Sequence, residues 1–181
     1  MSIVVEKGKV SRTKKCIIDA LLHLIEHEKF DEITVTQITQ EAEIARRTFY
    51  LNFNSKYEVL DCYIDILYKE YVEEVLECGS RSFEYDANQF FAFWKKHAEL
   101  LFLLEKNGLF MVLLSKFEEI LIETKYFDFS FWLDKGIDKG KRDYIASILA
   151  AILWKALEQW VKNDMKESVE ELVDTFVKII N

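Results

Sequence analysis

The sequence predicts an all-α protein with about nine helices. Apolar residues recur with the 3.6-residue period of an α-helix, and no segment keeps the alternating pattern of a strand. Proline, which breaks helices, does not occur among the 181 residues. The glycines lie where the helical period breaks, as helix ends and turns require. They are Gly8, Gly79, Gly108, Gly136 and Gly140.

The composition is typical of a globular protein without a membrane span. Half of the residues are apolar and 14% are aromatic, which argues against disorder. The apolar runs at 100–104 and 109–114 are far shorter than the ~20 residues needed to cross a bilayer. No apolar segment of signal-peptide length lies near the N-terminus, and Cys16, Cys62 and Cys78 form an odd count in helical segments. We therefore expect reduced thiols and a cytoplasmic protein.

Three helices are expected in the first part of the chain. Residues 12–28 carry a broad apolar stripe. Thr34 and Gln37 have the spacing of a capping box, in which each side chain bonds the other residue's backbone N–H, and they open a second helix that ends near Ala42. A short third helix is predicted over 46–52.

The sequence pattern in the rest of the chain predicts longer helices. Ser55 to Glu58 and Ser168 to Glu171 have the capping-box spacing, and Asp86 to Gln89 marks a further helix start. The helices are predicted at 55–76, 86–104, 109–125, 142–163 and 168–180, with an irregular tract at 126–140.

Charge is distributed unevenly between the two parts of the chain. Residues 1–56 hold nine Lys/Arg against eight Asp/Glu, whereas residues 57–181 hold fifteen against twenty-four, and the net charge is −8. Charges more than ~8–10 Å apart are largely screened at physiological salt. The acidic balance therefore does not exclude DNA as a partner, but it predicts modest, salt-sensitive affinity.

The segment from Ile17 to Leu60 resembles the DNA-binding domain of the tetracycline-repressor (TetR) family of transcriptional regulators. The resemblance implies a helix-turn-helix domain at 1–56 and a larger helical domain for effector binding and dimerisation at 57–181. The tail at 160–173 is similar to the closing helices of the branch that includes dihydroxyacetone-kinase regulators. The residues that carry the first resemblance are Ala20, Leu24, Thr34, Val35, Ile38, Ala42, Thr48, Phe49, Tyr50, Phe53, Lys56 and Leu60.

The resemblance implies a set of DNA contacts on the third helix and near it. Arg46 and Arg47 are placed where side chains reach base edges in the major groove, and an Arg fork can bond guanine O6 and N7 together. Phosphate contacts are implied for Thr36, Thr48, Tyr50 and Lys56, the last helped by the dipole of the helix that it begins. Leu51 and Asn52 are expected to reach bases or sugars.

Two departures from the family pattern bear on this assignment. The turn normally carries Gly where this chain has Glu43, and a left-handed conformation there would cost ~1–2 kcal/mol. A capping Ser is usual where this chain has Ala45, and a lost cap costs about 1 kcal/mol. Together with the acidic charge, these departures motivate an alternative: a TetR-like protein-interaction or coactivator module that has lost operator binding.

Aromatic and apolar residues of the middle helices predict a buried region. They occupy nearly all sides of their helices, which indicates burial. The resemblance implies an effector cavity in this region, so the alternatives are a pocket for a small apolar or aromatic ligand and a filled core. The candidate lining residues are Phe90, Phe93, Trp94, Phe102, Phe110, Met111, Leu114 and Phe117.

The apolar surface of the last two predicted helices indicates a homodimer. Their apolar surface, from Ile145 to Val161 and from Val169 to Ile180, exceeds what one small domain needs. Two such hairpins would form a four-helix bundle, and they would place two DNA-reading helices ~34–36 Å apart, at successive major grooves. A ligand in the larger domain would then act by tilting the helix that begins at Lys56.

Enzymatic and metal sites find little support in the sequence. His23 and His27 have an i, i+4 spacing able to chelate a metal, but no HExxH order is present. The chain also has no GxSxG motif, no phosphate-binding glycine loop and no CxxC. We expect neither catalysis nor a bound cofactor or metal.

Overall fold

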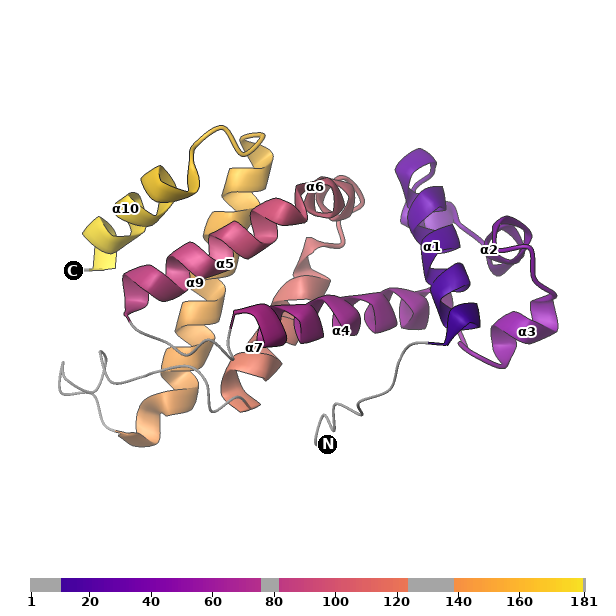
Figure 1. Cartoon of the computed structure of the whole chain (residues 1–181), viewed down its shortest axis with the longest axis horizontal. Helices are drawn as coiled ribbons and strands as arrows, with labels where there is room; N and C mark the ends of the chain where they lie inside the picture. The colour runs from indigo at the N-terminus through magenta and orange to yellow at the C-terminus, as the bar shows by residue number, and fades with distance from the viewer. Residues whose placement is uncertain (1–10, 76–81, 124–138, 181) are drawn as a thin grey trace. The chain divides into compact units, whose positions relative to one another are not determined.

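The computed structural model describes residues 11–75, 82–123 and 139–180 (Figure 1). Over these ranges the regular structure is entirely helical, with nine α-helices and two short 3-10 helices. The chain divides into two compact units, Met1–Lys69 and Glu70–Asn181, and the division falls within helix α4, Lys56–Glu74. None of the described helices combines the length and apolar character needed to span a membrane. The all-α prediction is confirmed.

The first unit begins with α1, Arg12–His27, whose N-terminus is capped by the Ser11 side chain. A 3-10 turn, η1, covers Phe30–Glu32, and α2, Val35–Glu41, packs on α1. Helix α3, Arg46–Tyr50, packs on α2. The core of this unit combines the buried stripe of α1 with side chains of the later elements. They are Ile17, Leu21, Ile25, Phe30, Ile38, Phe49, Phe53, Val59, Leu60 and Ile64.

The capping boxes that the sequence predicts form to different extents. Thr34 and Gln37 exchange both bonds, and so do Ser168 and Glu171. The box predicted at Ser55 is only half formed: the Glu58 amide donates to Ser55 Oγ at 3.2 Å, but the Glu58 carboxylate accepts from the amide of Asn54. Glu58 therefore bonds the residue before the predicted cap.

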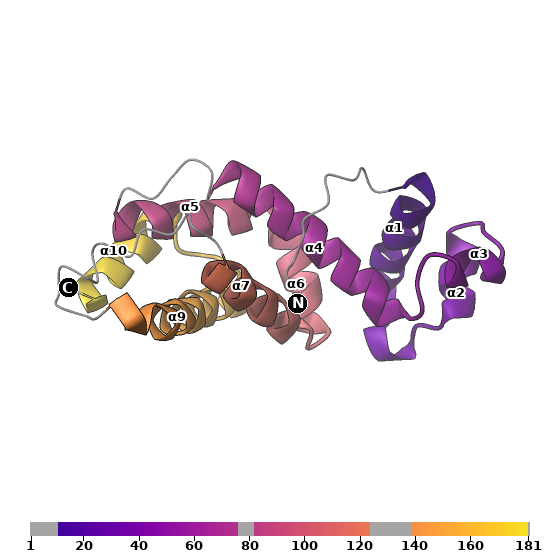
Figure 2. The ribbon, with the colours of Figure 1, turned by 90° about the horizontal axis from the view of Figure 1, so that it is seen from below.

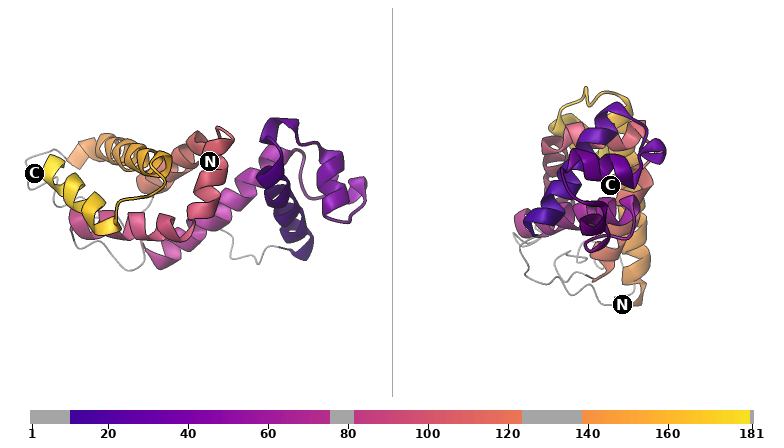
Figure 3. Two further views of the ribbon diagram at one scale, coloured as in Figure 1. Left: turned by 90° about the horizontal axis from the view of Figure 1, so that it is seen from above. Right: turned by 90° about the vertical axis from the view of Figure 1, so that its right-hand side faces the viewer.

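The second unit contains α5, Phe83–Lys96, α6, Ala98–Lys106, and α7, Phe110–Glu123. The short η3, Lys139–Lys141, leads into α9, Arg142–Lys162, and α10, Val169–Ile180, follows. Helix α7 packs along α9, as Figure 2 shows, and α10 packs along α5, as the left view of Figure 3 shows. The predicted irregular tract 126–140 lies almost entirely outside the described residues, as do Gly8, Gly79, Gly136 and Cys78.

The single helix predicted at 86–104 is wrong in both its start and its continuity. The Ser82 side chain caps α5 by accepting from the amide of Tyr85 at 3.1 Å, so the helix begins before Asp86. It ends at His97, whose backbone leaves the helical region (φ −104°, ψ 26°) and separates α5 from α6. The apolar pattern gives no sign of this break, because buried apolar residues continue on both sides of it, from Phe93 to Leu101. The His97 ring packs on Phe93, with ring centroids 4.7 Å apart.

Aromatic rings fill the core of the second unit. The Trp154 ring lies within 5.7 Å, centroid to centroid, of four other rings. Those rings belong to Phe90, Trp94, Phe110 and Phe117. A neighbouring cluster joins Phe91 to Trp160 at 6.0 Å and to Phe176 at 5.6 Å, which fastens α5 to α9 and α10.

Candidate nucleic-acid interface

The turn between α2 and α3 closes with Glu43 in a left-handed conformation, at φ 51°. The Glu43 amide donates to the Gln40 carbonyl and the Ile44 amide to the Thr39 carbonyl, at 3.1 and 3.0 Å, which is the Schellman pattern of a helix end. Helix α6 ends in the same pattern with Gly108 at φ 67°. Glycine is the residue that adopts this conformation without strain, so the strain anticipated at Glu43 is present.

Helix α3 begins without a side-chain cap. Ala45 occupies the N-cap position with an extended backbone (φ −69°, ψ 143°). Only its carbonyl accepts, from the amides of Thr48 and Phe49 at 2.8 and 3.3 Å. The first amides of α3 are therefore left to solvent or to a ligand. This is the consequence that the sequence predicts for Ala in place of Ser.

The burial pattern orients α3 with one face toward the core and the other toward solvent. Phe49, which is fully buried, and Phe53 anchor the inner face. Arg46 and Arg47 are exposed on the outer side, where Tyr50 is 48% exposed and Leu51 is 76% exposed. An apolar side chain as open as that of Leu51 has no packing role in the unit. The outer face therefore presents two guanidinium groups beside apolar and aromatic surface.

Arg46 and Tyr50 interact across one turn of α3. The Arg46 guanidinium donates to the Tyr50 hydroxyl at 3.5 Å, and its central carbon lies 5.8 Å from the ring centroid. Tyr50 in turn packs edge-on against buried Phe49, with ring centroids 5.5 Å apart. These contacts restrict the rotamers of both exposed side chains before any partner binds.

The remaining predicted contact residues occupy more varied positions. Thr36 is exposed on α2, and Thr48 is half-buried on α3. The Asn52 side-chain amide donates to the Thr48 carbonyl at 2.8 Å and so closes the C-terminal end of α3. Asn52 thus already has a structural bond, and its contact with a base or sugar would use its remaining polar atoms.

Lys56 is engaged inside the unit. Its ammonium donates to the carbonyl oxygens of Phe30, Asp31 and Ile33 at 2.6, 2.8 and 2.8 Å. An ammonium has three hydrogens, and these bonds use all of them. Lys56 therefore ties the first turn of α4 to η1, and its predicted phosphate contact stays a prediction. Spacing alone does not reveal this because the acceptors lie more than twenty positions earlier.

His23 contacts both the ring of His27, at 5.2 Å between centroids, and α2. Its Nδ1 atom lies 2.7 Å from the carboxylate of Glu41, which links α1 to α2. Among the residues that the structure describes, no group of three or more His, Cys, Asp or Glu side chains is placed to hold a metal ion.

The predicted effector-pocket residues separate into two sets. Most belong to the packed core, whereas two lie on outer faces of their helices, against the burial that the sequence pattern predicts. The periodic pattern is apolar on all sides of α6 and α7 and therefore cannot distinguish core from surface. Phe90, Phe93, Trp94, Phe110 and Phe117 are buried, Leu114 is half-buried, and Phe102 and Met111 are exposed.

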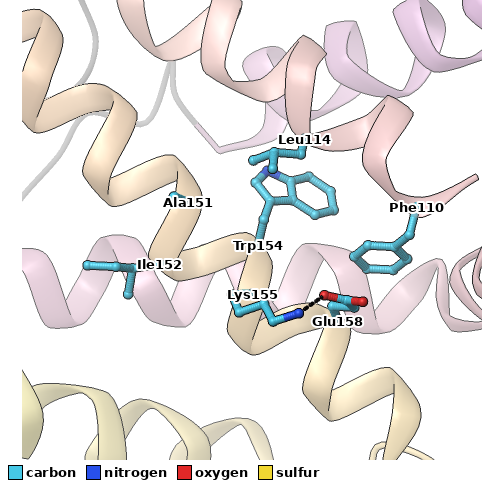
Figure 4. A pocket seen from close by; sticks show the side chains of 7 residues that line it. All are labelled: Phe110, Leu114, Ala151, Ile152, Trp154, Lys155 and Glu158. Atoms are coloured by element: carbon cyan, nitrogen blue, oxygen red, sulfur yellow. Dashed lines mark hydrogen bonds and ion pairs between the residues drawn. The ribbon is translucent and has the colours of Figure 1, made fainter.

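A groove of about 390 Å³ lies between α7 and α9 (Figure 4). Phe110 and Leu114 are the only predicted pocket residues that line it. The other lining residues come from α9, which the sequence assigns to dimerisation, and no sequence signal marks them as a ligand site. The full lining is Phe110, Leu114, Ala151, Ile152, Trp154, Lys155 and Glu158.

Helix α9 also presents an exposed apolar stripe. Tyr144, Ile148 and Ile152 follow one another at four-residue spacing and are all exposed. On α10 most apolar residues are buried or half-buried, and Ile179 is exposed. In this single chain the uncovered apolar surface of the two closing helices is therefore concentrated on α9.

Comparisons with known proteins agree with this geometry. Residues 17–61 match the family model "Bacterial regulatory proteins, tetR family", and residues 86–181 match "Transcriptional regulator C-terminal region". The second match covers more than half of the chain. A search of curated proteins returns no significant sequence match.

Solved structures with a similar fold cover almost the whole chain. The fatty acid degradation regulator FadR from Bacillus halodurans matches with TM-score 0.59 and 21% identity, covering 93% of this chain and 94% of that one. The dihydroxyacetone kinase operon activator DhaS matches with TM-score 0.55 and 20% identity over 93% of each chain. The TetR family repressor AlkX from Dietzia sp. strain DQ12-45-1b matches with TM-score 0.51 and 17% identity, covering 96% and 95%.

Proposed function

Because the chain belongs to the tetR family of bacterial transcriptional regulators, we propose that it is a sequence-specific repressor whose hold on DNA is controlled by a small-molecule effector. The observation that carries the proposal is the outer face of α3. Arg46, Arg47 and Tyr50 are open to solvent, while Phe49 and Phe53 fix the opposite face in the core. A short helix held in this way can enter a major groove without rearranging the unit.

The chemistry of the outer face supports a division of roles between bases and backbone. Arg46 and Arg47 carry planar forks suited to guanine, and exposed Leu51 offers apolar contact to a thymine methyl. Thr36, Thr48 and Tyr50 have hydroxyls that suit phosphate oxygens, which fix register without reading sequence. The uncapped amides at the start of α3 add donors for an anion.

A homodimer would present two copies of this face. The stripe formed by Tyr144, Ile148 and Ile152 on α9 supports an interface there, since exposed apolar residues at regular helical spacing are suited to packing against a second helix. Helix α10 would contribute through Ile179. Two-fold symmetry then predicts a palindromic operator with half-site centres ~34–36 Å apart.

Effector control is proposed to act through α4, which belongs to both units. The three bonds of Lys56 tie the first turn of α4 to η1 and the segment that leads into α2, so a shift of the helix axis would be passed to the start of α2. Two of the regulators with a similar fold are named for fatty acid degradation and for n-alkane biodegradation, which supports an apolar effector. DhaS is named an activator and AlkX a repressor, so these names do not decide between activation and repression. That this chain represses is part of the proposal.

An interaction module that has lost operator binding is the competing function. Two observations favour it: the strained turn at Glu43, and the missing cap at Ala45. Both affect the turn that sets the angle of α3. The exposed carboxylate of Glu43 would also be repelled by nearby phosphates.

Selection of bound duplexes from a random pool, at several salt concentrations, tests both functions. An operator-binding regulator enriches a palindrome, and Arg46→Ala or Arg47→Ala reduces discrimination by about 1–3 kcal/mol at the base concerned. Lys29→Ala removes an exposed charge of the same unit away from α3 and serves as the control. An interaction module enriches no sequence, and its partner binding is unaffected by the two Arg variants.

A further inference from the structure

Two histidines lie one turn apart on the exposed side of α1, near its C-terminal end. The side chains of His23 and His27 are 55% and 66% exposed, and their ring centroids are 5.2 Å apart. A metal–nitrogen bond of ~2.0–2.1 Å places two imidazole rings that share one ion about 4.5–5.2 Å apart, centre to centre, at bond angles of ~90–110°. The rings therefore already have the separation that a shared ion requires. Because both are open to solvent, turning their nitrogens toward an ion disturbs no core packing.

A carboxylate from α2 fixes the tautomer of His23. The Nδ1 atom of His23 lies 2.7 Å from the carboxylate of Glu41, the last residue of α2. An ionised carboxylate only accepts hydrogen bonds, so Nδ1 carries the hydrogen and, in the neutral ring, Nε2 keeps its lone pair. Metal-binding histidines almost always have this arrangement, in which the other ring nitrogen donates to a carboxylate or a carbonyl. The sequence shows only the spacing of the two histidines, because Glu41 lies eighteen positions after His23.

The surroundings of the two rings favour a cation. His27 is the last residue of α1, where the negative end of the helix dipole lies. The Glu26 carboxylate lies 4.0 Å from His27 Nε2, and Asp19, one turn before His23, is exposed on the same helix. Together with Glu41, these groups place negative charge near the pair.

We propose that His23 and His27 bind a divalent transition-metal ion, of the class of Cu²⁺ and Ni²⁺, with Glu41 as the positioning residue that orients His23. Imidazole suits these ions, and their square-planar or tetragonal coordination accepts two neighbouring nitrogens, with water at the remaining positions. Zinc sites in proteins use three or four protein ligands, so Zn²⁺ should bind more weakly than Cu²⁺ at this pair. The proposal does not depend on whether the chain binds DNA.

A bound ion would stabilise the first unit. It would join two turns at the end of α1, and through the bond from His23 to Glu41 it would hold the end of α2. That end of α2 leads directly into the turn before α3. An ion that binds the folded chain and not the unfolded one raises the thermal midpoint by mass action. The midpoint should therefore rise with added metal and return when EDTA removes it.

Titration of Ni²⁺ into the full-length protein tests the site. Ni²⁺ is preferred as the probe because Cu²⁺ oxidises thiols, and Cys16 is exposed on α1. Calorimetry should give one ion per chain. In the ¹⁵N-labelled protein, the paramagnetic ion should broaden amide signals at the ends of α1 and α2 only. Mg²⁺, which takes oxygen ligands, reports attraction to the chain's net charge of −8 and should cause neither effect.

His23→Gln and His27→Gln each leave one imidazole and should weaken Ni²⁺ binding by at least about 10-fold, since loss of an outer partner alone costs that much. His97→Gln removes the third histidine of the chain and is the matched control, and Cys16→Ser excludes the thiol. Both should leave the affinity unchanged. His27→Gln combined with Lys29→His keeps two histidines in the segment but places them six positions apart, and it should not restore binding.

Glu41→Ala and Glu41→Gln test the positioning role. Removing an outer carboxylate should weaken metal binding about 10-fold, and Glu41→Gln should recover part of the loss because its side-chain oxygen still accepts from Nδ1. Equal losses in the two variants would show that Glu41 acts through its charge alone. The metal site is overturned if Ni²⁺ does not bind, if Mg²⁺ has the same effect, or if binding survives His23→Gln or His27→Gln.

Discussion

The ammonium of Lys56 donates to the carbonyl oxygen of Phe30 at 2.6 Å and lies 4.9 Å from the centroid of the same residue's ring. Phe30 is buried in the core of the first unit, and its carbonyl belongs to η1. The neighbouring carbonyls of Asp31 and Ile33 accept from the same ammonium. The Lys56 side chain thus donates hydrogen bonds to the carbonyls of the turn between α1 and α2, and it holds the start of α4 against that turn.

We predict that Lys56→Met destabilises the DNA-reading unit by about 2–3 kcal/mol, the scale of a hydrogen bond to a charged group. Three carbonyls lose their shared donor, while the apolar stem of the side chain is retained. Urea denaturation followed by circular dichroism measures the change. Lys29→Met, at an exposed position beside η1, should alter stability by no more than about 0.5 kcal/mol.

The same variant separates a structural Lys56 from a phosphate-binding one. Losing a phosphate contact reduces the slope of log affinity against log salt by about 1. We expect the slope of Lys56→Met to match that of the natural protein at a temperature where both are folded. A reduced slope would show that the ammonium leaves its three carbonyls to bind DNA.

Glu43→Gly should stabilise the protein by about 1 kcal/mol. Glycine removes the strain of a side chain in the left-handed region, and the greater freedom of glycine in the unfolded chain offsets part of that gain. Thermal denaturation of Glu43→Gly and Glu43→Gln distinguishes backbone strain from charge. If Glu43→Gln gives the same gain, charge rather than φ is the cause.

Ala45→Ser should stabilise α3 by about 1 kcal/mol by supplying the missing N-cap acceptor. The extended backbone of Ala45 already suits a capping residue, so the new hydroxyl needs no rearrangement to reach the amide of Arg47 or Thr48. Ala45→Val cannot cap and is the control. Hydrogen exchange of the first α3 amides should slow in the Ser variant alone.

Ile148→Asp should dissociate the proposed dimer, because it places a charge at the centre of the stripe on α9. Light scattering at micromolar concentration measures the mass. Met111→Asp introduces the same charge on the exposed face of α7 and should leave the mass unchanged. Ile179→Asp tests whether α10 takes part. If this variant dissociates the dimer, both closing helices lie in the interface; if the dimer stays intact, α9 is the closing helix that forms it.

Glu158→Gln should lower stability at neutral pH by no more than about 1 kcal/mol, the scale of an ion pair that solvent partly screens. The bonds from Lys155 and Lys162 lower the pKa of Glu158 in the folded protein. A lowered folded-state pKa stabilises the fold above the ordinary value of 4.5, and this contribution is lost as the pH falls through the lowered pKa. Denaturation at a series of pH values should show the variant and the natural protein converging in acid.

Local chemistry determined much of this protein from sequence alone. The 3.6-residue period located most of the helices, because burying an apolar stripe is the main source of helix stability in a folded chain. The capping pairs at Thr34 and Ser168 placed two helix starts to the residue, since those bonds join groups three positions apart. The strained turn at Glu43 and the uncapped start at Ala45 were predicted instead from departures from the family pattern, and the structure has both.

Tertiary structure decided what depends on partners distant in the chain. Lys56 has the sequence position of a phosphate ligand, but carbonyls more than twenty residues earlier bind its ammonium. His97 lies in an unbroken apolar pattern, and yet its backbone leaves the helical region and ends α5. Whether the His23 imidazole meets the Glu41 carboxylate depends on how α1 packs on α2. Periodicity marks which side of a helix is buried, but only the packed chain determines which polar groups meet there and which are left without a partner.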